Sequence, residues 1–575
     1  MDRPQPKKFN TTGVCVPSKH YMLPVLPRIP AIDDMVEGEF YFILRAPRQS
    51  GKTTYIEALT NKINSDGQYY AFDCSLDGLR FTTDVEKGIS SIVALINTAV
   101  KTSDVPVLKS LGYPDDGIPK SDHSVKLFNM LNYLSAELDK ELVVFFDEAD
   151  CLTGQVLIPF LSQIRNGYLR RHRSVSTKFP RSMALIGMRD IRDYLVQVRP
   201  EDQAVGLASP FNVKKESLTL ANFTQAEIQT LYCQHTEATG QVFTQDAIER
   251  AWYWSEGQPW LVNAIAGEIV VKQLRNDFPT VISESNIDQA AQTLILRNET
   301  HFDSLRERLK EPRVRRVIEA LVIGASKFPK GISADDVSYT VDLGLLKTDP
   351  IRSKVFLPAN PVYQEIIERT FTTNIDLDIQ DEEIESYRNK WMDGKNFDMS
   401  GLLRAFQKFW SKNAEMYVKN NKYDGMILNS ISDALAKFKF PSELSEEINK
   451  EIGDGITEGL INLTNEALTH LVLFAFLQRV LNGEADFIQS EYALGTLRAD
   501  ICVGYKDRNY PLELKIHGSK SREESLDQLF GYMNKSRAPE GWLVVFDKDF
   551  TKLWDKKIYW VTQTYKEKII HVVGC

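Results

Sequence analysis

Two carboxylates and a lysine near the end of the chain have the residue types of a divalent-cation site. Asp500, Glu513 and Lys515 form the pattern D-x12-E-x-K within the stretch RADICVGYKDRNYPLELKIH. Two carboxylates held close together repel one another unless a cation lies between them, and Mg²⁺ prefers such oxygen ligands. A lysine beside the metal can orient or deprotonate a water, while the metal stabilises charge on a phosphate. If the fold brings them together, these residues predict phosphodiester hydrolysis.

A second set of residues has the pattern of a nucleotide-phosphate site. The motif A-x-x-x-x-G-K-T begins at Ala46, where glycine is commonest. Gly51 lets the backbone approach phosphate, Lys52 reaches the terminal phosphates and Thr53 offers a hydroxyl to Mg²⁺. The predicted nucleotide contacts in this loop are Ala46, Pro47, Arg48, Gln49, Ser50, Gly51, Lys52, Thr53 and Thr54.

The stretch ELVVFFDEAD supplies the acidic partner that such a loop requires. Its five apolar residues, Leu142 to Phe146, favour a central parallel strand, so Asp147 falls at the carboxyl end, where open α/β sheets bind ligands. We expect Asp147 to hold Mg²⁺ through water and Glu148 to polarise the water that attacks the γ-phosphate. A later strand, SMALIGM, leads to Arg189, which is either a γ-phosphate sensor or an arginine in a salt bridge at a strand end.

The elements around these residues must position them. The apolar stretch from Tyr41 to Leu44 predicts a strand before the phosphate loop, and the spacing of apolar residues after it predicts a helix. Further on, Gly257-Gln-Pro-Trp260 should end one helix and begin another, because proline suits a helix's first turn. This places Pro259 at the start of the second helix.

A hairpin must bring the three late charges together. A turn centred between Asp507 and Arg508 would pair Lys515 with Asp500 and Glu513 with Cys502. Because side chains alternate along a strand, the three charges then share one face, while Leu512, Leu514 and Ile516 occupy the other. Before the hairpin, TNEALTHLVLFAFLQRVLN has a helical apolar stripe with Glu466 near its start.

Length and composition limit the classes of protein. A chain of 575 residues, 43% hydrophobic and 26% charged, predicts two to four globular domains. No apolar run approaches the roughly 20 residues of a membrane span, and the first residues lack a signal-peptide core, so the cytoplasm is the default location. The six cysteines form no CxxC pair and are expected to be reduced thiols. Net charge is −9, and the basic run from Arg165 to Ser182 is either a local nucleic-acid groove or a solvated face.

The first two thirds of the chain resemble a family of nucleotide-binding proteins. The segments FNTTGVCVPSKHYMLPVLPRI, APRQSGKTT, VVFFDEAD, ALIGMRDIRDY and GQPWLVNA look like bacterial AAA-like/STAND ATPases between about Phe9 and Thr370. The resemblance implies ATP and Mg²⁺ as cofactors, with Pro259 near the base. It also makes His20 and Tyr21 candidates for base or ribose contact.

The last third resembles the PD-(D/E)XK nuclease superfamily. Asp500, Glu513 and Lys515 match its core positions, although no proline precedes Asp500. The resemblance implies a metal site for Mg²⁺ or Mn²⁺ completed by Glu466, with Glu491 as the alternative acid. The element Gln528-x-x-x-Tyr532 is similar to the exonuclease branch, and its two residues lie one helical turn apart, where they can contact phosphate or brace the site.

Together these patterns and the two resemblances imply an α/β multidomain protein: a P-loop ATPase with a parallel sheet, a helical lid and a winged-helix module, then a restriction-endonuclease-like α/β domain. For the winged-helix module we favour packing over DNA reading. The expected boundaries are 1–215 for the ATPase core with its leader, 216–310 for the lid, 311–373 for the winged-helix-like module, 374–397 for an acidic linker and 398–575 for the nuclease-like domain.

The predicted function is ATP-dependent control of a nuclease acting on nucleic acid, with DNA favoured over RNA. A rival is a STAND-like sensor or scaffold whose last domain binds nucleic acid or protein without cutting. A DNA-translocating motor ranks lower, because no further helicase motif is present. By analogy, the setting is prokaryotic genome defence with a phage or foreign-element trigger. The oligomeric state is open, and no membrane partner is expected.

Overall fold

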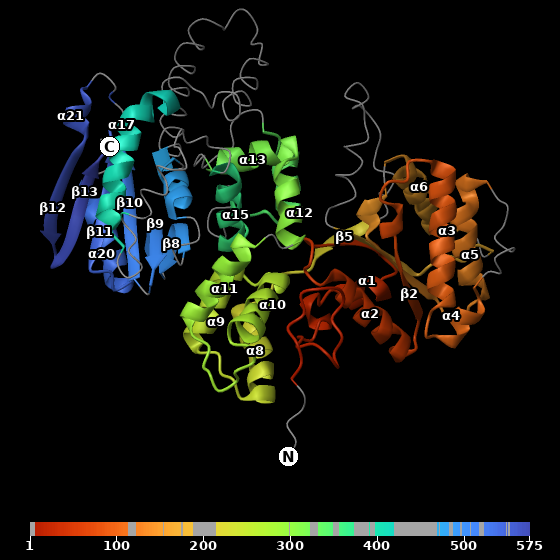
Figure 1. Cartoon of the computed structure of the whole chain (residues 1–575). Helices are drawn as coiled ribbons and strands as arrows, with labels where there is room; N and C mark the ends of the chain where they lie inside the picture. Colours follow the sequence, from red (N-terminus) through yellow and green to blue (C-terminus); the bar gives the residue numbers. More distant parts are fainter. Residues whose placement is uncertain are drawn as a thin grey trace, which may run out of the picture. The chain divides into compact units, whose positions relative to one another are not determined.

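In the computed structural model the chain divides into two units. The described residues are 6–112, 122–152, 154–173, 176–187, 214–297, 300–322, 332–348, 356–372, 390, 397–418, 469–470, 472–481, 487–494, 497–506, 508–516, 522–547, 549 and 552–575. One unit comprises residues 1–287 with 338–346, and the other comprises 288–337 with 347–575. Figure 1 shows the elements of both.

The first unit is built on a five-stranded parallel sheet, as predicted. Its strands are β1 (Tyr41–Arg45), β2 (Tyr70–Ser75), β3 (Leu142–Asp147), β4 (Ser182–Gly187) and β5 (Lys214–Thr219), in the order β2-β3-β4-β1-β5. Every residue of β3 and β4 is buried, which explains their continuous apolar sequences. Parallel pairing places the carboxyl ends of all five strands at one edge.

Helices cover both faces of this sheet (Figure 1). On one face, α1 (Ile32–Glu37) and α2 (Lys52–Asp66) pack against Phe42 and Leu44 of β1. On the other, α3 (Val85–Lys101), α5 (His123–Glu137) and α6 (Gly154–Arg170) pack against Tyr41 and Ile43. The alternation of strand side chains therefore divides the core into two layers. Shorter helices are η1 (Leu26–Arg28), η2 (Asp77–Leu79), α4 (Pro106–Ser110) and η3 (Ala149–Cys151).

A helical region follows the sheet. It contains α8 (Gln225–Thr239), α9 (Gln245–Ser255), α10 (Pro259–Gly267) continued by the π-helix η5 (Glu268–Gln273), and α11 (Glu284–Leu296). A capping box between Thr224 and Glu227 starts α8. The predicted break at Gly257-Gln-Pro is confirmed: Gly257 has φ +75°, and Pro259 begins α10.

More helices precede a small sheet. They are α12 (Thr300–Leu309), α13 (Pro312–Val322) and α14 (Ala334–Asp342), followed by the two short strands β6 (Leu346–Thr348) and β7 (Phe356–Pro358) and by α15 (Pro361–Thr372). Residues 338–346, which include the end of α14, group with the first unit, although the residues on either side group with the second.

The second unit contains a six-stranded mixed sheet. Its strands are β8 (Phe487–Leu494), β9 (Leu497–Tyr505), β10 (Arg508–Ile516), β11 (Glu540–Phe546), β12 (Tyr559–Tyr565) and β13 (Lys568–Gly574), in the order β12-β13-β11-β10-β9-β8. The helix α17 (Met399–Val418) and the helical residues 472–481 share a core with one face. The helix α20 (Arg522–Lys535) shares a core with the other face, and α21 (Trp554–Lys557) is a short helix. None of the described helices is long and apolar enough to cross a membrane.

The register of the β9-β10 hairpin differs from the prediction. Pro511 pairs with Cys502 and Leu512 with Ile501, so the predicted pairing of Glu513 with Cys502 is wrong by two residues. The cause is a shorter turn: β9 runs to Tyr505, which pairs with Arg508. Because the shift is an even number of residues, it leaves every side chain on its predicted face.

Candidate functional site

The phosphate loop connects β1 to α2 at the carboxyl edge of the parallel sheet. Gln49 and Gly51 have positive φ angles of 57° and 90°, which turn the chain tightly before the helix begins. The Ser50 hydroxyl donates to the Pro47 carbonyl at 2.8 Å. The loop thus ends on the amino terminus of a 15-residue helix, where free amides and the helix dipole favour an anion.

Lys52 is held inside this loop. Its Nζ donates hydrogen bonds of 2.9 Å to the carbonyls of Ala46 and Pro47. The residue is 7% exposed, and burial lowers its pKa, an effect that Glu148, Asp150 and Asp147 oppose. A cation held here faces the position at which the loop would place terminal phosphates.

Asp147 joins the acidic motif to the phosphate loop. The Thr53 hydroxyl donates to Asp147 Oδ2 at 2.8 Å, and the Glu148 amide donates to Oδ1 at 2.9 Å. Asp147 is the last residue of β3 and is 4% exposed. A hydroxyl and a carboxylate at the edge of a phosphate site are the protein groups that Mg²⁺ uses with nucleotides. Thr53 and Asp147 fit that ion.

Glu148 lies beside Asp147 in a left-handed backbone conformation, with φ 54°. Burial raises its pKa, the carboxylates of Asp150 and Asp147 raise it further, and Lys52 and Arg80 oppose them. A carboxylate with a raised pKa at a phosphate site has the character of a general base.

Arg80 is a site residue that the sequence analysis did not identify. Its guanidinium lies 3.7 Å from Glu148 Oε2 and 2.7 Å from Asp77 Oδ1. It also donates to Cys151 Sγ at 3.2 Å. Asp77, Glu148 and Cys151 have the types of metal ligands within 4.8 Å of one another, but Arg80 already supplies a cation to that cluster. The sequence signal that points to Arg80 is its position after β2, because the carboxyl end of β2 lies at the same edge of the sheet as the phosphate loop.

The amino-terminal leader and α10 enclose a cavity next to the phosphate loop. Its volume is about 410 Å³. The Cys15 amide donates to the Thr54 hydroxyl at 3.2 Å, and the Trp260 indole donates to the Thr11 carbonyl at 2.9 Å. These contacts attach the leader to both sides of the site. The cavity lining includes Thr11, Tyr21, Arg28, Lys52, Glu148, Leu231, Pro259, Trp260 and Asn263.

The two leader residues expected at the base or ribose differ in position. Tyr21 lines the cavity, and its hydroxyl lies 3.2 Å from His235 Nδ1. The ring of His20 instead accepts a hydrogen bond from the Val16 amide at 2.9 Å and is not among the lining residues. Pro259, which the resemblance places near the base, lines the cavity. Arg28, from η1, is a further lining residue that was missed, and it donates to the Ser50 carbonyl at 3.4 Å.

The late charged residues lie on neighbouring strands of the mixed sheet. Lys515 Nζ is 2.9 Å from Glu513 Oε1, and Asp500 Oδ2 accepts a hydrogen bond of 2.6 Å from the Leu514 amide. The Glu513 side chain has no exposed surface, whereas Asp500 is half-buried. Carboxylates at adjacent positions of paired strands are donors that suit Mg²⁺ or Mn²⁺.

The helix α20 covers the face that carries these charges. Glu513 is in register with Leu543, which packs in the α20 core, whereas Leu512 and Leu514 pack in the opposite core. Gln528 and Tyr532 lie on α20, and Tyr532 is buried. The structure therefore brings five predicted site residues to one side of the sheet.

Three predicted residues have no side chain described. Arg189 and Glu466 lie outside the described residues. Glu491, the alternative acid, is described only through the backbone of β8. The sensor role and the choice between the two acids therefore stay predictions.

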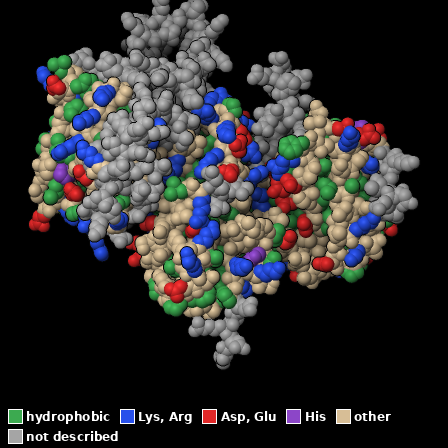
Figure 2. All heavy atoms as spheres, in the orientation of Figure 1, with side chains coloured by type: hydrophobic (Ala, Val, Ile, Leu, Met, Phe, Trp, Pro, Cys, Tyr) green, Lys and Arg blue, Asp and Glu red, His purple; other side chains and the backbone are tan. Residues whose placement is uncertain are grey.

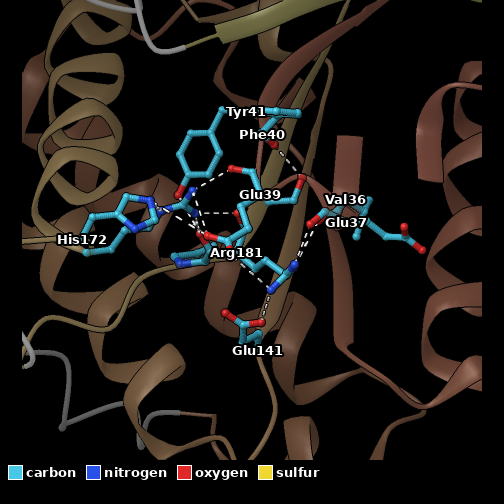
Figure 3. Close-up of polar contacts among 11 residues, drawn as sticks. Val36, Glu37, Glu39, Phe40, Tyr41, Glu141, His172 and Arg181 are labelled. Carbon is cyan, nitrogen blue, oxygen red and sulfur yellow. Dashed lines mark hydrogen bonds and ion pairs between the residues drawn. The ribbon is translucent and has the colours of Figure 1, made fainter. Parts of the chain in front are cut away.

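Two arginines of the basic run stabilise the opposite edge of the parallel sheet. Arg171 donates to the carbonyls of Glu39, Pro180 and Arg181, the first two at 2.6 and 2.7 Å. Arg181 donates to the carbonyls of Val36 and Glu37 at 3.2 and 2.6 Å and forms an ion pair with Glu141 (Figure 3). Both guanidiniums are therefore engaged in the fold.

The distribution of charged side chains on the surface agrees with the modest net charge of the chain. On the face of the molecule that Figure 2 shows, basic and acidic side chains are interspersed over the surface of the described residues. A net charge of −9 over 575 residues is consistent with this mixture.

Comparisons with known proteins find similarity in structure alone. A Walker-type ATPase of Pyrococcus abyssi is similar at 15% identity and TM-score 0.43, over 62% of this chain and 99% of that one. The ORC2 protein of Aeropyrum pernix is similar at 14% identity and TM-score 0.36, over 60% of this chain and 91% of that one. The RuvB Holliday junction branch migration motor of Thermotoga maritima is similar at 16% identity and TM-score 0.31, over 58% of this chain and 91% of that one.

No protein-family model matches the chain, and no curated relative matches it. The structural similarities are too weak to assign a family. The nucleotide site therefore rests on the geometry of Lys52, Thr53, Asp147 and Glu148.

Proposed function

We propose that the first unit binds and hydrolyses ATP with Mg²⁺. The observation that carries this proposal is the hydrogen bond between Thr53 and Asp147, which joins the phosphate loop to an acidic strand end with Lys52 and Glu148 beside it. Bound Mg²⁺ would neutralise phosphate charge. Lys52 would hold the terminal phosphates, and Glu148 would accept a proton from the attacking water.

We further propose that the second unit is a metal-dependent nuclease acting on DNA. Asp500, Glu513 and Lys515 on one face of β9 and β10 support this, as does the order of elements: a helix, the hairpin, the helix with Gln528 and Tyr532, and a further strand. A metal held by Asp500 and Glu513 would stabilise phosphate charge. Lys515 would orient or deprotonate the attacking water.

One observation favours the alternative of binding without cleavage. The ion pair between Glu513 and Lys515 lies at a carboxylate with no exposed surface, and such a pair can serve packing alone. On this reading the chain is a sensor or scaffold whose second unit holds nucleic acid or a protein.

A segment beside the phosphate loop offers a route for control. Asp342 Oδ1 forms an ion pair of 3.0 Å with Arg45, the last residue of β1. Gly344 lies against Pro47, so closely that a Cβ on Gly344 would come within 2.5 Å of Pro47 Cγ. Both residues belong to the segment 338–346, whose flanking chain belongs to the second unit. A movement of the loop on nucleotide binding would therefore be transmitted to this segment.

The test is a cleavage assay with the full chain. Single-stranded, duplex and branched DNA are incubated with Mg²⁺ or Mn²⁺, with and without ATP, using the wild type and the variants Asp500→Ala, Lys515→Ala and Lys52→Ala. We expect metal-dependent cleavage that both second-unit variants abolish and that Lys52→Ala makes independent of ATP. Cleavage that persists in both variants contradicts the catalytic assignment. An inactive wild type that binds DNA tightly supports the alternative.

A further inference from the structure

Asn263 lies in the nucleotide cavity, and the nitrogen of its side-chain amide already has a hydrogen-bond partner. It belongs to α10, lines the cavity, and is 7% exposed. Its Nδ2 donates a hydrogen bond of 2.8 Å to the Pro259 carbonyl one turn earlier. Oxygen and nitrogen of an amide are assigned from such contacts, and a carbonyl accepts only from the nitrogen, so this bond fixes the orientation.

The other half of the amide is a buried acceptor. Among the residues that the structure describes, no hydrogen-bond donor contacts Asn263 Oδ1, which is shielded from solvent. Burying a polar atom without a partner costs free energy, and native folds rarely retain such atoms without a reason. A ligand donor within the cavity would supply the partner.

The place of Asn263 in the cavity indicates which part of a nucleotide it meets. Gln258, at the start of α10, donates to the Gln49 carbonyl of the phosphate loop at 3.5 Å. Asn263 is five residues further along the helix, roughly 7 Å at 1.5 Å per residue. The cavity lining also includes Trp260 and Leu231, whose apolar surfaces suit a base.

We propose that Asn263 Oδ1 accepts a hydrogen bond from the exocyclic amine of adenine and so selects 6-aminopurine nucleotides. The inference rests on the proposed nucleotide-binding function and names its base. A guanine or hypoxanthine would present a carbonyl oxygen to the same acceptor, and two acceptors repel one another. Sites built to bond a substrate N–H reject analogues that lack it.

The test compares two triphosphates that differ only in the exocyclic amine. Binding of ATP and of purine riboside 5′-triphosphate to the full chain is measured by calorimetry with Mg²⁺ present. The wild type should bind ATP about tenfold more tightly, since one hydrogen bond is worth about that factor. In Asn263→Leu the two affinities should become equal, at the value that the wild type shows for purine riboside 5′-triphosphate. That retained affinity also reports that the cavity is intact.

A second asparagine provides the matched control. Asn10 lines the same cavity, but its Oδ1 already accepts from the Thr12 amide at 3.2 Å. Asn10→Ala should therefore leave the ratio of the two affinities unchanged. If Asn263→Leu does not fold, Asn263→Ala removes the amide without added volume, in the residue type best suited to a helix.

The outcomes separate this inference from the proposed function. Equal affinities in the wild type, or a preference for ATP that survives in the Asn263 variants, overturns the role of Asn263 while nucleotide binding stands. If neither triphosphate binds the wild type, the nucleotide function itself fails.

Discussion

The Thr53 hydroxyl donates a 2.8 Å hydrogen bond to Asp147, a residue 94 positions away in the chain. The bond joins the first turn of α2 to the end of β3, and β4 separates β3 from β1 in the sheet. The contact therefore exists only once three strands have paired. The proposed Mg²⁺ position between Thr53 and Asp147 therefore depends on the order of the strands in the sheet.

Removing the Thr53 hydroxyl should weaken Mg²⁺-dependent nucleotide binding. Thr53→Val keeps the shape but loses the oxygen, and we expect metal affinity with nucleotide to fall at least roughly tenfold. Thr53→Ser retains the hydroxyl and should stay close to the wild type. Titration of Mg²⁺ against the protein with ATP measures the effect, and equal losses in both variants would contradict the metal role.

Arg80 should set the pH range of ATP hydrolysis. Burial raises the pKa of Glu148, so this base becomes protonated, and the rate falls, at a pH above the usual carboxyl range. Arg80 opposes that rise, so Arg80→Ala should raise the pKa further and move the acid limb to higher pH. Arg80→Lys keeps the charge and should shift the limb less. The pH profile of kcat measures the position of the acid limb. An acid limb that does not move in Arg80→Ala would contradict the effect of Arg80 on the pKa of Glu148.

A methyl group on Gly344 should disturb the phosphate loop. Gly344 has φ +77°, and its added Cβ would come within 2.5 Å of Pro47. We expect Gly344→Ala to weaken ATP binding about tenfold. Gly67→Ala is the matched control, because Gly67 has φ +71° but no atom nearer than 3.9 Å to an added Cβ. The two share the backbone strain, so equal losses of affinity would exclude the contact with Pro47 as the cause.

Arg171 should contribute to stability without affecting the nucleotide site. Its guanidinium donates to carbonyls at the amino-terminal edge of the parallel sheet. Arg171→Ala leaves these carbonyls without that donor and should lower the free energy of unfolding by about 3 kcal/mol. Arg173→Ala, at an exposed neighbour, should change it by less than about 0.5 kcal/mol. Urea denaturation compares the two, and similar losses would contradict the assignment.

The pair of Lys515 and Glu513 should be tested for stability as well as for cleavage. Lys515→Met removes the ammonium 2.9 Å from a carboxylate without exposed surface, at an expected cost of about 3 kcal/mol. The double variant Lys515→Met/Glu513→Gln removes both charges and should recover much of that loss. Denaturation midpoints measure this, and a single variant as stable as the wild type would show that the pair contributes little to folding.

Local sequence was sufficient for the strands and helices around the nucleotide site. The apolar runs 41–44, 142–146 and 183–186 within β1, β3 and β4 contain no charged residue, so burial in a parallel sheet is the favourable outcome. The break before Pro259 also followed from local chemistry, because proline has no amide to donate within a helix. Period-2 alternation put Asp500, Glu513 and Lys515 on one face despite the wrong register, since the error was even.

Other features depended on contacts between distant residues. The hairpin register was decided by a turn that closes at Tyr505 and Arg508, and strand propensity cannot distinguish shifts of two residues. Arg80 and Arg28 were missed because their relation to the site arises from the packing of η2 and η1. By sequence alone, Arg171 and Arg181 lie in a run that indicates a basic surface. In the structure, carbonyls before β1 and β4 accept hydrogen bonds from Arg171, and carbonyls at the end of α1 accept them from Arg181.

The sequence by itself determined which residues could do chemistry, because residue type fixes charge, hydrogen-bonding capacity and local backbone preference. The tertiary structure decided which of them meet, because distances between Thr53 and Asp147, Arg80 and Glu148, or Gln258 and the phosphate loop depend on strand order and helix packing. It also decided which polar atoms are left without a partner, as with Asn263 Oδ1 among the described residues. Burial and pairing are properties of the assembled core, and no single segment contains them.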